Sequence, residues 1–253
     1  MRIAMLSLHT SPLAPLGGRE TGGMNVYVRE VAAQLAMLGV QVDVFTRRSS
    51  TTEDEVRLIA DGAGGASARL VQVTAGPKAR IEKEEMLPFC GAFADGVEAF
   101  RAREAVTYDV IYSHYWLSAE AGSLLAQRWD VPHAAMFHTL AEVKLRARAS
   151  ELEPRERIEA EQRLVAGLDR IIAATEHERR LLMQIYRVPA SRVAVVPLGV
   201  DLDQFQPRSQ AEARAALGID PSERMVLAIG RIEPLKGFDI VIRAIAQLSD
   251  RRH

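Results

Sequence analysis

Three short polar segments of this sequence could hold a hydroxyl-rich ligand, because each directly follows an apolar run of the kind that forms a buried strand. They are His9-Thr10, Ser113-His114-Tyr115 and His138-Thr139. Imidazole, hydroxyl and phenol groups all exchange hydrogen bonds with a polyol. Taken singly, each histidine fits a structural role. The carboxyl ends of parallel strands meet at one edge of a sheet, however, so we expect the three segments to line one crevice.

A fourth segment, Gly22-Gly23, stands just before Met24-Asn25, where a helix is expected to begin. Glycine lets backbone N–H groups approach an anion closely, and the N-terminus of a helix carries a partial positive charge. The spacing is not the G-x-G-x-x-G of dinucleotide-binding proteins. A flexible turn before an ordinary helix would explain the glycines equally well, but their position after the first strand favours anion binding.

Basic residues form two further candidate sites. Lys83 and Arg157 lie in charged stretches that, taken alone, read as solvated surface or as helical ion pairs such as Arg157 with Glu161. Arg231 and Lys236 lie between two glycines at a predicted turn from strand to helix, and together they have the character of a phosphate clamp. The turn is not a Walker A loop, and no spacing of His, Cys and carboxylates predicts a metal site.

The elements that must position these residues are short apolar runs alternating with helical segments, and this order predicts parallel βαβ units in a doubly wound α/β sheet. Strands are expected at Arg2–Leu8, Val40–Val44, Arg69–Thr74, Val110–Ser113, Ala134–Phe137, Arg170–Ala174, Val193–Val196 and Met225–Ile229. Helices are expected at Gly23–Leu38, Pro88–Arg103, Ser118–Trp129, Pro154–Ala166, from Thr175 through Ile185, from Ser209 to Gly218, and at Phe238–Leu248. The Gly- and Ala-rich stretch Thr51–Ser67 reads as a surface excursion.

This order also predicts how the chain divides into domains. Residues 1–204 are expected to form a Rossmann-like domain, and residues 205–253 a linker with the incomplete start of a second one. The second part would contribute the strand Met225–Ile229 and the helix after it, and these cannot close a layered domain by themselves.

The composition is that of a globular protein, with 48% hydrophobic and 26% charged residues. A formal net charge of −1 gives no electrostatic case for nucleic acid as a partner. The single cysteine, Cys90, excludes an intramolecular disulfide framework. No apolar stretch approaches the roughly 20 residues that span a bilayer, and the N-terminus does not read as a signal peptide. We therefore expect a cytoplasmic protein without a membrane span.

Taken together, these features resemble the family-4 GT-B glycosyltransferases. The resemblance rests on the segments Met5–Leu13, Gly22–Tyr27, Ser113–Ser118, His138–Ala141 with Val143-Lys144, and Gly230-Arg231 with Lys236-Gly237, and it covers nearly the whole chain. Within the family these segments look most like the D-inositol-3-phosphate glycosyltransferases of the mycothiol pathway. Arg157–Glu161 also looks like sucrose-phosphate synthases. The resemblance implies a GT-B fold whose first Rossmann-like domain binds the acceptor and whose second binds the nucleotide sugar.

The resemblance also implies roles for individual residues. Gly22 and Gly23 would face the donor diphosphate, and Arg231 and Lys236 would neutralise it as it leaves. His138 would contact the transferred sugar near the reacting carbon. The residues that would hold the acceptor are His9, Asn25, Lys83, Tyr115, Thr139 and Arg157, the last four at its phosphate. The choice of Arg157 over Arg155 is provisional, because the segment after Lys144 differs in length from the expected pattern.

The expected reaction is a retaining transfer of sugar from a nucleotide-sugar donor, UDP-GlcNAc or a similar one, to a phosphorylated polyol such as inositol phosphate. The resemblance implies no cofactor and no catalytic metal. Transfer of glucose to fructose 6-phosphate is one alternative, and a non-catalytic domain that binds a phosphorylated ligand is another. Assembly into a homodimer is a further possibility that the sequence leaves open. The family's two donor-domain glutamates would lie beyond residue 253, so we expect this chain alone to be inactive.

Overall fold

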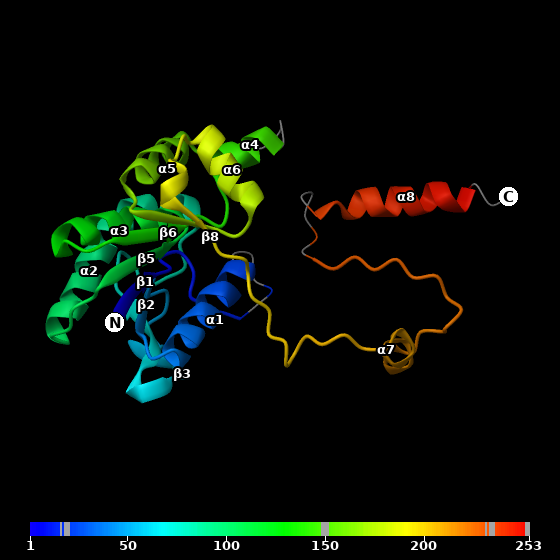
Figure 1. Cartoon of the computed structure of the whole chain (residues 1–253), viewed down its shortest axis with the longest axis horizontal. Coiled ribbons are helices and arrows are strands. Elements are labelled where there is room, and N and C mark those ends of the chain that lie inside the picture. Colours follow the sequence, from blue (N-terminus) through cyan, green and yellow to red (C-terminus); the bar gives the residue numbers. More distant parts are fainter. Residues whose placement is uncertain (16, 18–20, 148–151, 231, 233–235, 251–253) are drawn as a thin grey trace. The chain divides into compact units, whose positions relative to one another are not determined.

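The computed structural model describes all residues except 16, 18–20, 148–151, 231, 233–235 and 251–253 (Figure 1). The chain divides into two compact units, Met1–Leu198 and Gly199–His253, and each is described here by itself. The division predicted after residue 204 falls inside the second of these units.

The first unit is built on an eight-stranded sheet with the order β3-β4-β2-β1-β5-β6-β7-β8. Its strands are β1 (Arg2–Leu6), β2 (Gln41–Arg47), β3 (Val56–Asp61), β4 (Ser67–Val73), β5 (Val110–His114), β6 (His133–Met136), β7 (Arg170–Ala173) and β8 (Val193–Val195). Every neighbouring pair is parallel except β3 with β4. The predicted doubly wound α/β sheet is confirmed, with the polar segments of β1, β5 and β6 at one edge.

Helices cover both faces of this sheet (Figure 1). They are α1 (Gly23–Met37), α2 (Cys90–Arg103), α3 (Trp116–Trp129), α4 (Ala141–Ala147), α5 (Arg155–Gly167) and α6 (Glu176–Ile185), with short 3-10 turns η1 (Ala63–Gly65), η2 (Lys83–Glu85), η3 (Leu87–Phe89) and η4 (Ala190–Arg192). Strand β1 shows why two cores form, because successive side chains point to opposite faces. Ile3 and Met5 pack in one buried cluster with Val28 of α1, whereas Ala4 and Leu6 belong to the cluster of α2, α3 and α5.

Two features of the first unit differ from the sequence prediction. Thr51–Ser67 is not only a surface excursion, because β3 within it pairs antiparallel with the edge of the sheet. Leu58 of β3 is 56% exposed, so this edge strand lacks the buried apolar pattern by which a strand is predicted. Pro154 is the residue before α5 and not its first helical residue.

The second unit contains two helices among its described residues, α7 (Gln210–Leu217) and α8 (Phe238–Asp250). Ser209 caps the first of them, because its hydroxyl accepts the backbone N–H of Glu212 at 3.1 Å. The predicted strand Met225–Ile229 is wrong, since these residues have no strand conformation. A strand needs a partner for its N–H and C=O groups, and the described part of this unit contains none.

Candidate active site

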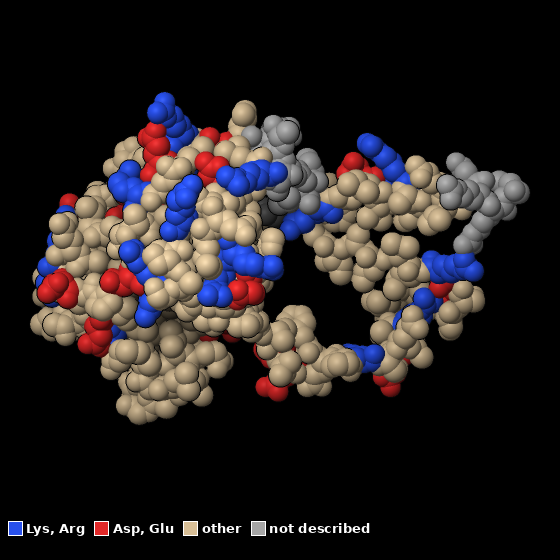
Figure 2. Space-filling view, turned by 45° about the horizontal axis from the view of Figure 1, so that its top comes forward, with Lys and Arg blue, Asp and Glu red and all other residues tan. Residues whose placement is uncertain are grey.

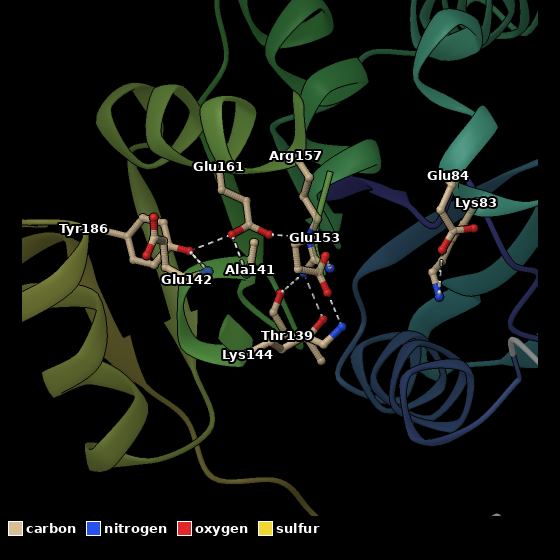
Figure 3. Close-up of polar contacts among 10 residues, drawn as sticks. All are labelled: Lys83, Glu84, Thr139, Ala141, Glu142, Lys144, Glu153, Arg157, Glu161 and Tyr186. Atoms are coloured by element: carbon tan, nitrogen blue, oxygen red, sulfur yellow. Dashed lines mark hydrogen bonds and ion pairs between the residues drawn. The ribbon is translucent and has the colours of Figure 1, made fainter. Parts of the chain in front are cut away.

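Arg157, on the first turns of α5, is the centre of a buried polar network at the carboxyl edge of the sheet (Figure 3). Its side chain is 4% exposed, and its Nε donates to Glu161 Oε1 at 2.7 Å. Its Nη1 donates to Glu153 Oε2 at 2.7 Å, and its Nη2 donates to the carbonyl and hydroxyl of Thr139 at 2.9 and 3.2 Å. Two carboxylates therefore compensate a cation that would otherwise be costly to bury.

Glu161 connects this arginine to the neighbouring helices. Its Oε2 accepts the backbone N–H of Ala141 at 2.8 Å and the hydroxyl of Tyr186 at 2.7 Å (Figure 3). These bonds hold the start of α4 and the end of α6 against α5. The segment that carries Thr139 is thus fixed from three sides, which limits the positions that its hydroxyl can take.

Tyr115 lies under the guanidinium of Arg157, with the arginine Cζ 5.0 Å from its ring centroid. It occupies the N-cap position of α3 with φ of 73°, a left-handed conformation that is uncommon for a bulky residue. Its ring also meets that of His9, at 4.7 Å between centroids. Residues after β1 and β5 are therefore in contact here, and Arg157 joins them to Thr139 after β6, as the convergence of strand ends predicts.

An open pocket of about 850 Å³ lies beside this network. The residues that line it are Lys83, Glu84, Glu85, Leu87, Pro88, Tyr115, Trp116, Lys144, Leu152, Glu153, Pro154, Glu156 and Arg157. Lys83 comes from η2, across from α5 in Figure 3, and forms a half-exposed ion pair with Glu84 at 3.6 Å. Arg155, the alternative to Arg157, is 88% exposed, pairs with Glu159 on the surface of α5 and does not line the pocket.

His9 is kept uncharged by its surroundings. Burial lowers its pKa to about 3, and the positive charges of Lys83 and Arg157 add to the effect. A neutral imidazole can both donate and accept a hydrogen bond, which suits contact with a sugar or inositol hydroxyl.

His138 stands at the end of β6 in an unusual backbone conformation. Its φ is 61°, and the backbone N–H of Thr139 bonds across it to the carbonyl of Phe137 at 2.7 Å, which makes a γ-turn of the rarer, strained kind. Its Nε2 lies 3.1 Å from Nδ1 of the fully buried His114. Burial lowers the pKa of His138 to about 4, so its ring is neutral at physiological pH.

The glycines and Asn25 lie at the start of α1. A Cβ added to Gly22 or Gly23 would meet nothing within 4 Å, so their backbone is open on that side. The amide of Asn25, 1% exposed, donates to the Thr10 hydroxyl and to the Ser11 carbonyl at 2.7 Å each, and its oxygen accepts from the Gly22 N–H at 3.0 Å. In this structure Asn25 braces the loop after β1, and its role toward an acceptor stays a prediction.

The two residues of the predicted phosphate clamp belong to the second unit. Lys236 is exposed at the turn before α8. Arg231 lies outside the described residues. Their roles at a donor diphosphate therefore stay predictions.

The sequence reasoning missed Glu153 as a partner of Arg157 and gave Lys144 no role. Lys144, on α4, forms an ion pair with Glu153 and lines the same pocket. A signal was present, because Glu153 and Glu161 stand four residues on either side of Arg157, the spacing of helical ion pairs.

Comparison with known proteins identifies the family. The model of Glycosyltransferase Family 4 matches residues 21–204. The chain belongs to this family. A curated relative from Kineococcus radiotolerans is 45% identical to this chain over 98% of its length. Another, from Actinosynnema mirum, is 44% identical over 99% of its length. Both are named D-inositol 3-phosphate glycosyltransferase, and the chain spans 57% and 60% of their lengths.

Solved structures of other glycosyltransferases share the fold of this family member. Sucrose-phosphate synthase from Thermosynechococcus elongatus is 30% identical, with a TM-score of 0.85 over 97% of this chain and 59% of its own. Anabaena HepE, solved in complex with UDP-glucose, is 16% identical, with a TM-score of 0.62 over 98% of this chain and 57% of its own. These likenesses support the GT-B assignment of the first unit.

Proposed function

We propose that the first unit is the acceptor-binding domain of a retaining glycosyltransferase, which transfers a sugar from a nucleotide donor to a phosphorylated polyol such as inositol phosphate. The observation that carries the proposal is the pocket between η2 and α5. Lys83, Tyr115 and Arg157 line it, and Arg157 holds the hydroxyl of Thr139. The names of the relatives, at 44–45% identity over nearly the whole chain, support inositol phosphate as the acceptor.

Charge and hydrogen bonding suit this pocket to a phosphate. Lys83 from η2 and Lys144 from α4 bring ammonium groups to its lining, and Tyr115 brings a hydroxyl. The hydroxyl of Thr139 is held by Arg157 beside the pocket. Hydrogen bonds between such cations and phosphate oxygens are among the stronger ones in proteins. Arg157 contributes mainly by fixing Thr139 and Tyr115, because two carboxylates already accept from its guanidinium.

In the proposed reaction an acceptor hydroxyl oxygen forms the new bond to the anomeric carbon while the bond from that carbon to the nucleotide's diphosphate oxygen breaks, and the departing diphosphate takes the hydroxyl's proton. Negative charge then gathers on the departing diphosphate, and groups placed in advance to stabilise it supply most of the rate gain. The open backbone at Gly22 and Gly23, with Lys236 and Arg231, is proposed for this task. His138 is proposed to contact the transferred sugar. The donor is proposed to be a UDP-sugar such as UDP-GlcNAc.

A second candidate acceptor is fructose 6-phosphate, which the likeness to sucrose-phosphate synthase favours at 30% identity. The two are separated by incubating the complete gene product with UDP-GlcNAc or UDP-glucose and with inositol 3-phosphate, inositol or fructose 6-phosphate, and detecting products by mass spectrometry. We expect transfer to inositol 3-phosphate and none to inositol. Faster transfer to fructose 6-phosphate would contradict the proposal, and binding without transfer would favour a non-catalytic domain.

A further inference from the structure

A second pocket, of about 300 Å³, opens at the carboxyl ends of β1, β2 and β4. We call it the Arg47 pocket. Its wall includes His9, Thr46, Arg47, Glu53, Arg57 and Arg80. It shares no lining residue with the pocket around Lys83 and Arg157, although His9 in its wall contacts Tyr115 of the other pocket.

Arg47 presents an unused pair of donors. It is 5% exposed, and its Nη1 donates to the carbonyls of Arg48 and Pro77 at 3.3 and 2.7 Å, while Nη2 donates to that of Ala79 at 2.6 Å. A guanidinium has five N–H groups. Those left over are Nε–H, which has no partner, and one hydrogen of Nη2. These unpartnered N–H groups, the free side of Arg47, are donors that an oxygen of a carboxylate or phosphate could accept.

The charge of Arg47 is also less compensated than that of the other deeply buried arginine. Glu153 and Glu161 pair with Arg157, and although burial opposes it, Tyr115 and these carboxylates raise the pKa of Arg157. Among the described residues no carboxylate lies within ion-pair distance of Arg47, and burial lowers its pKa. A buried cation held only by carbonyl groups is stabilised further by an anion.

Two more polar atoms in the wall lack partners. Thr46 is 2% exposed, and its hydroxyl has no hydrogen-bond partner. The Nδ1 atom of His9 is also buried without a hydrogen-bond partner. Buried polar groups in folded proteins are nearly always paired with protein groups, water or ions, so these two atoms are available to pair with a small polar ligand.

The mouth of the pocket is positively charged, like Arg47 inside it. Arg57 and Arg80 are exposed there, and Arg80 pairs with Glu82 at 3.6 Å. Among the described residues of the wall, Glu53 is the one carboxylate, and it accepts a hydrogen bond from Gln72 at 2.6 Å. The described part of the wall thus carries three guanidinium groups and one carboxylate, and this excess of positive charge would attract an anion.

We infer that the Arg47 pocket is an oxyanion site, which takes the phosphate or carboxylate group of a small molecule between the free side of Arg47 and the hydroxyl of Thr46. The site is distinct from the proposed acceptor pocket, and the inference does not depend on the proposed function. The two pockets adjoin through the contact between the rings of His9 and Tyr115.

The test is an NMR titration of the ¹⁵N-labelled chain with inorganic phosphate and, separately, acetate, at constant ionic strength. The Nε–H resonance of Arg47 and the amide of Thr46 report on the site. We expect a saturable shift at both, from phosphate, from acetate or from both, according to the oxyanion preferred. Thr46→Val keeps the shape and removes the hydroxyl, and Arg57→Gln removes a cation at the mouth. Each should weaken binding about tenfold, the value of a hydrogen bond to a charged group.

Two matched variants separate this site from its surroundings. Arg155→Gln removes an exposed arginine on α5 that is not in the pocket wall, and Lys83→Gln changes a residue that lines the proposed acceptor pocket and not this one. Both should leave the response of Arg47 unchanged. The inference is overturned if sodium chloride produces the same shifts, if neither oxyanion shifts Arg47, if Thr46→Val and Arg57→Gln both bind like the wild type, or if Lys83→Gln abolishes the response.

Discussion

At the scale of single residues, His138 is the group proposed to contact the transferred sugar. His114 engages its Nε2, so Nδ1 is the ring nitrogen that the proposal assigns to the sugar. Positive φ is tolerated best by glycine and asparagine. Asparagine is therefore the substitution that tests the side chain without adding backbone strain.

In the complete gene product we expect His138→Asn to lower kcat by about tenfold to hundredfold, as loss of a hydrogen bond that strengthens in the transition state would. The KM for the nucleotide sugar should change much less. Steady-state kinetics and a melting curve check this. Normal turnover with a lowered melting temperature would assign His138 a purely structural role.

His133 illustrates a buried histidine with a structural role. It is 3% exposed, its Nε2 lies 2.8 Å from the Ser113 hydroxyl, and burial lowers its pKa to about 4. The unfolded chain, with a histidine pKa of about 6.5, binds more protons between these values. The free energy of unfolding should therefore be greatest above about pH 6.5 and fall as the pH approaches 4.

Urea denaturation at a series of pH values measures this dependence. His133→Gln should reduce the slope by about 1.4 kcal/mol per pH unit in this window, because one titrating group is lost. The matched control is His177→Gln, which removes an exposed histidine on α6 and should leave the slope unchanged. An unaltered slope in His133→Gln would show that the charged imidazole is accommodated in the folded unit.

At the scale of elements, Arg157 joins α5 to Thr139 after β6, and its partner Glu161 joins α5 to the start of α4. Arg157→Ala would leave Glu153 and Glu161 without the cation between them and would free Thr139. We expect the first unit to lose about 3–5 kcal/mol of stability, as when one partner of a buried ion pair is removed.

The matched control is Arg155→Ala, two residues away on the same helix, at an exposed ion pair. Its effect should be below about 1 kcal/mol. Chemical denaturation of both variants measures the two losses in the free energy of unfolding. Equal stability would mean that water enters the network and replaces the guanidinium.

The parallel strands and most helices were predictable, because buried apolar runs and helical periods are recorded directly in the residue types. The caps at Thr175 and Ser209 were predictable too, since each hydroxyl accepts the N–H of the residue three positions on. The edge strand β3 was not, because its exposed side chains carry no such pattern. Nor was the burial of Arg157, which depends on Glu153, Glu161 and Thr139 meeting in three dimensions.

At the scale of the whole molecule, the two units differ in how fully their apolar residues are buried. The first has cores on both faces of its sheet. In the second, Ile229 is 85% exposed and Leu227 68% exposed, although the sequence predicts a buried strand there. The apolar residue types of Met225–Ile229 predict a strand, but partner strands are needed before these residues can form a sheet. Within the described residues, no helix is both long enough and apolar enough to cross a membrane.

Acidic and basic side chains are interspersed on the face of the first unit shown in Figure 2. The proposed recognition of a phosphorylated ligand therefore rests on the local placement of Lys83, Lys144 and Arg157, and not on the net charge of −1. Lys83 is the best of these to alter, because its side chain is 40% exposed and its removal should leave the fold intact.

The most direct test of the central claim is isothermal titration of this chain with inositol 3-phosphate and with inositol. We predict measurable binding of the phosphorylated ligand, no detectable binding of inositol, and a loss of about tenfold or more in affinity for Lys83→Gln, as for a charge-assisted hydrogen bond. Arg155→Gln should bind like the wild type. Equal affinity for the two ligands, or a Lys83→Gln variant that binds as tightly as the wild type, would contradict the account.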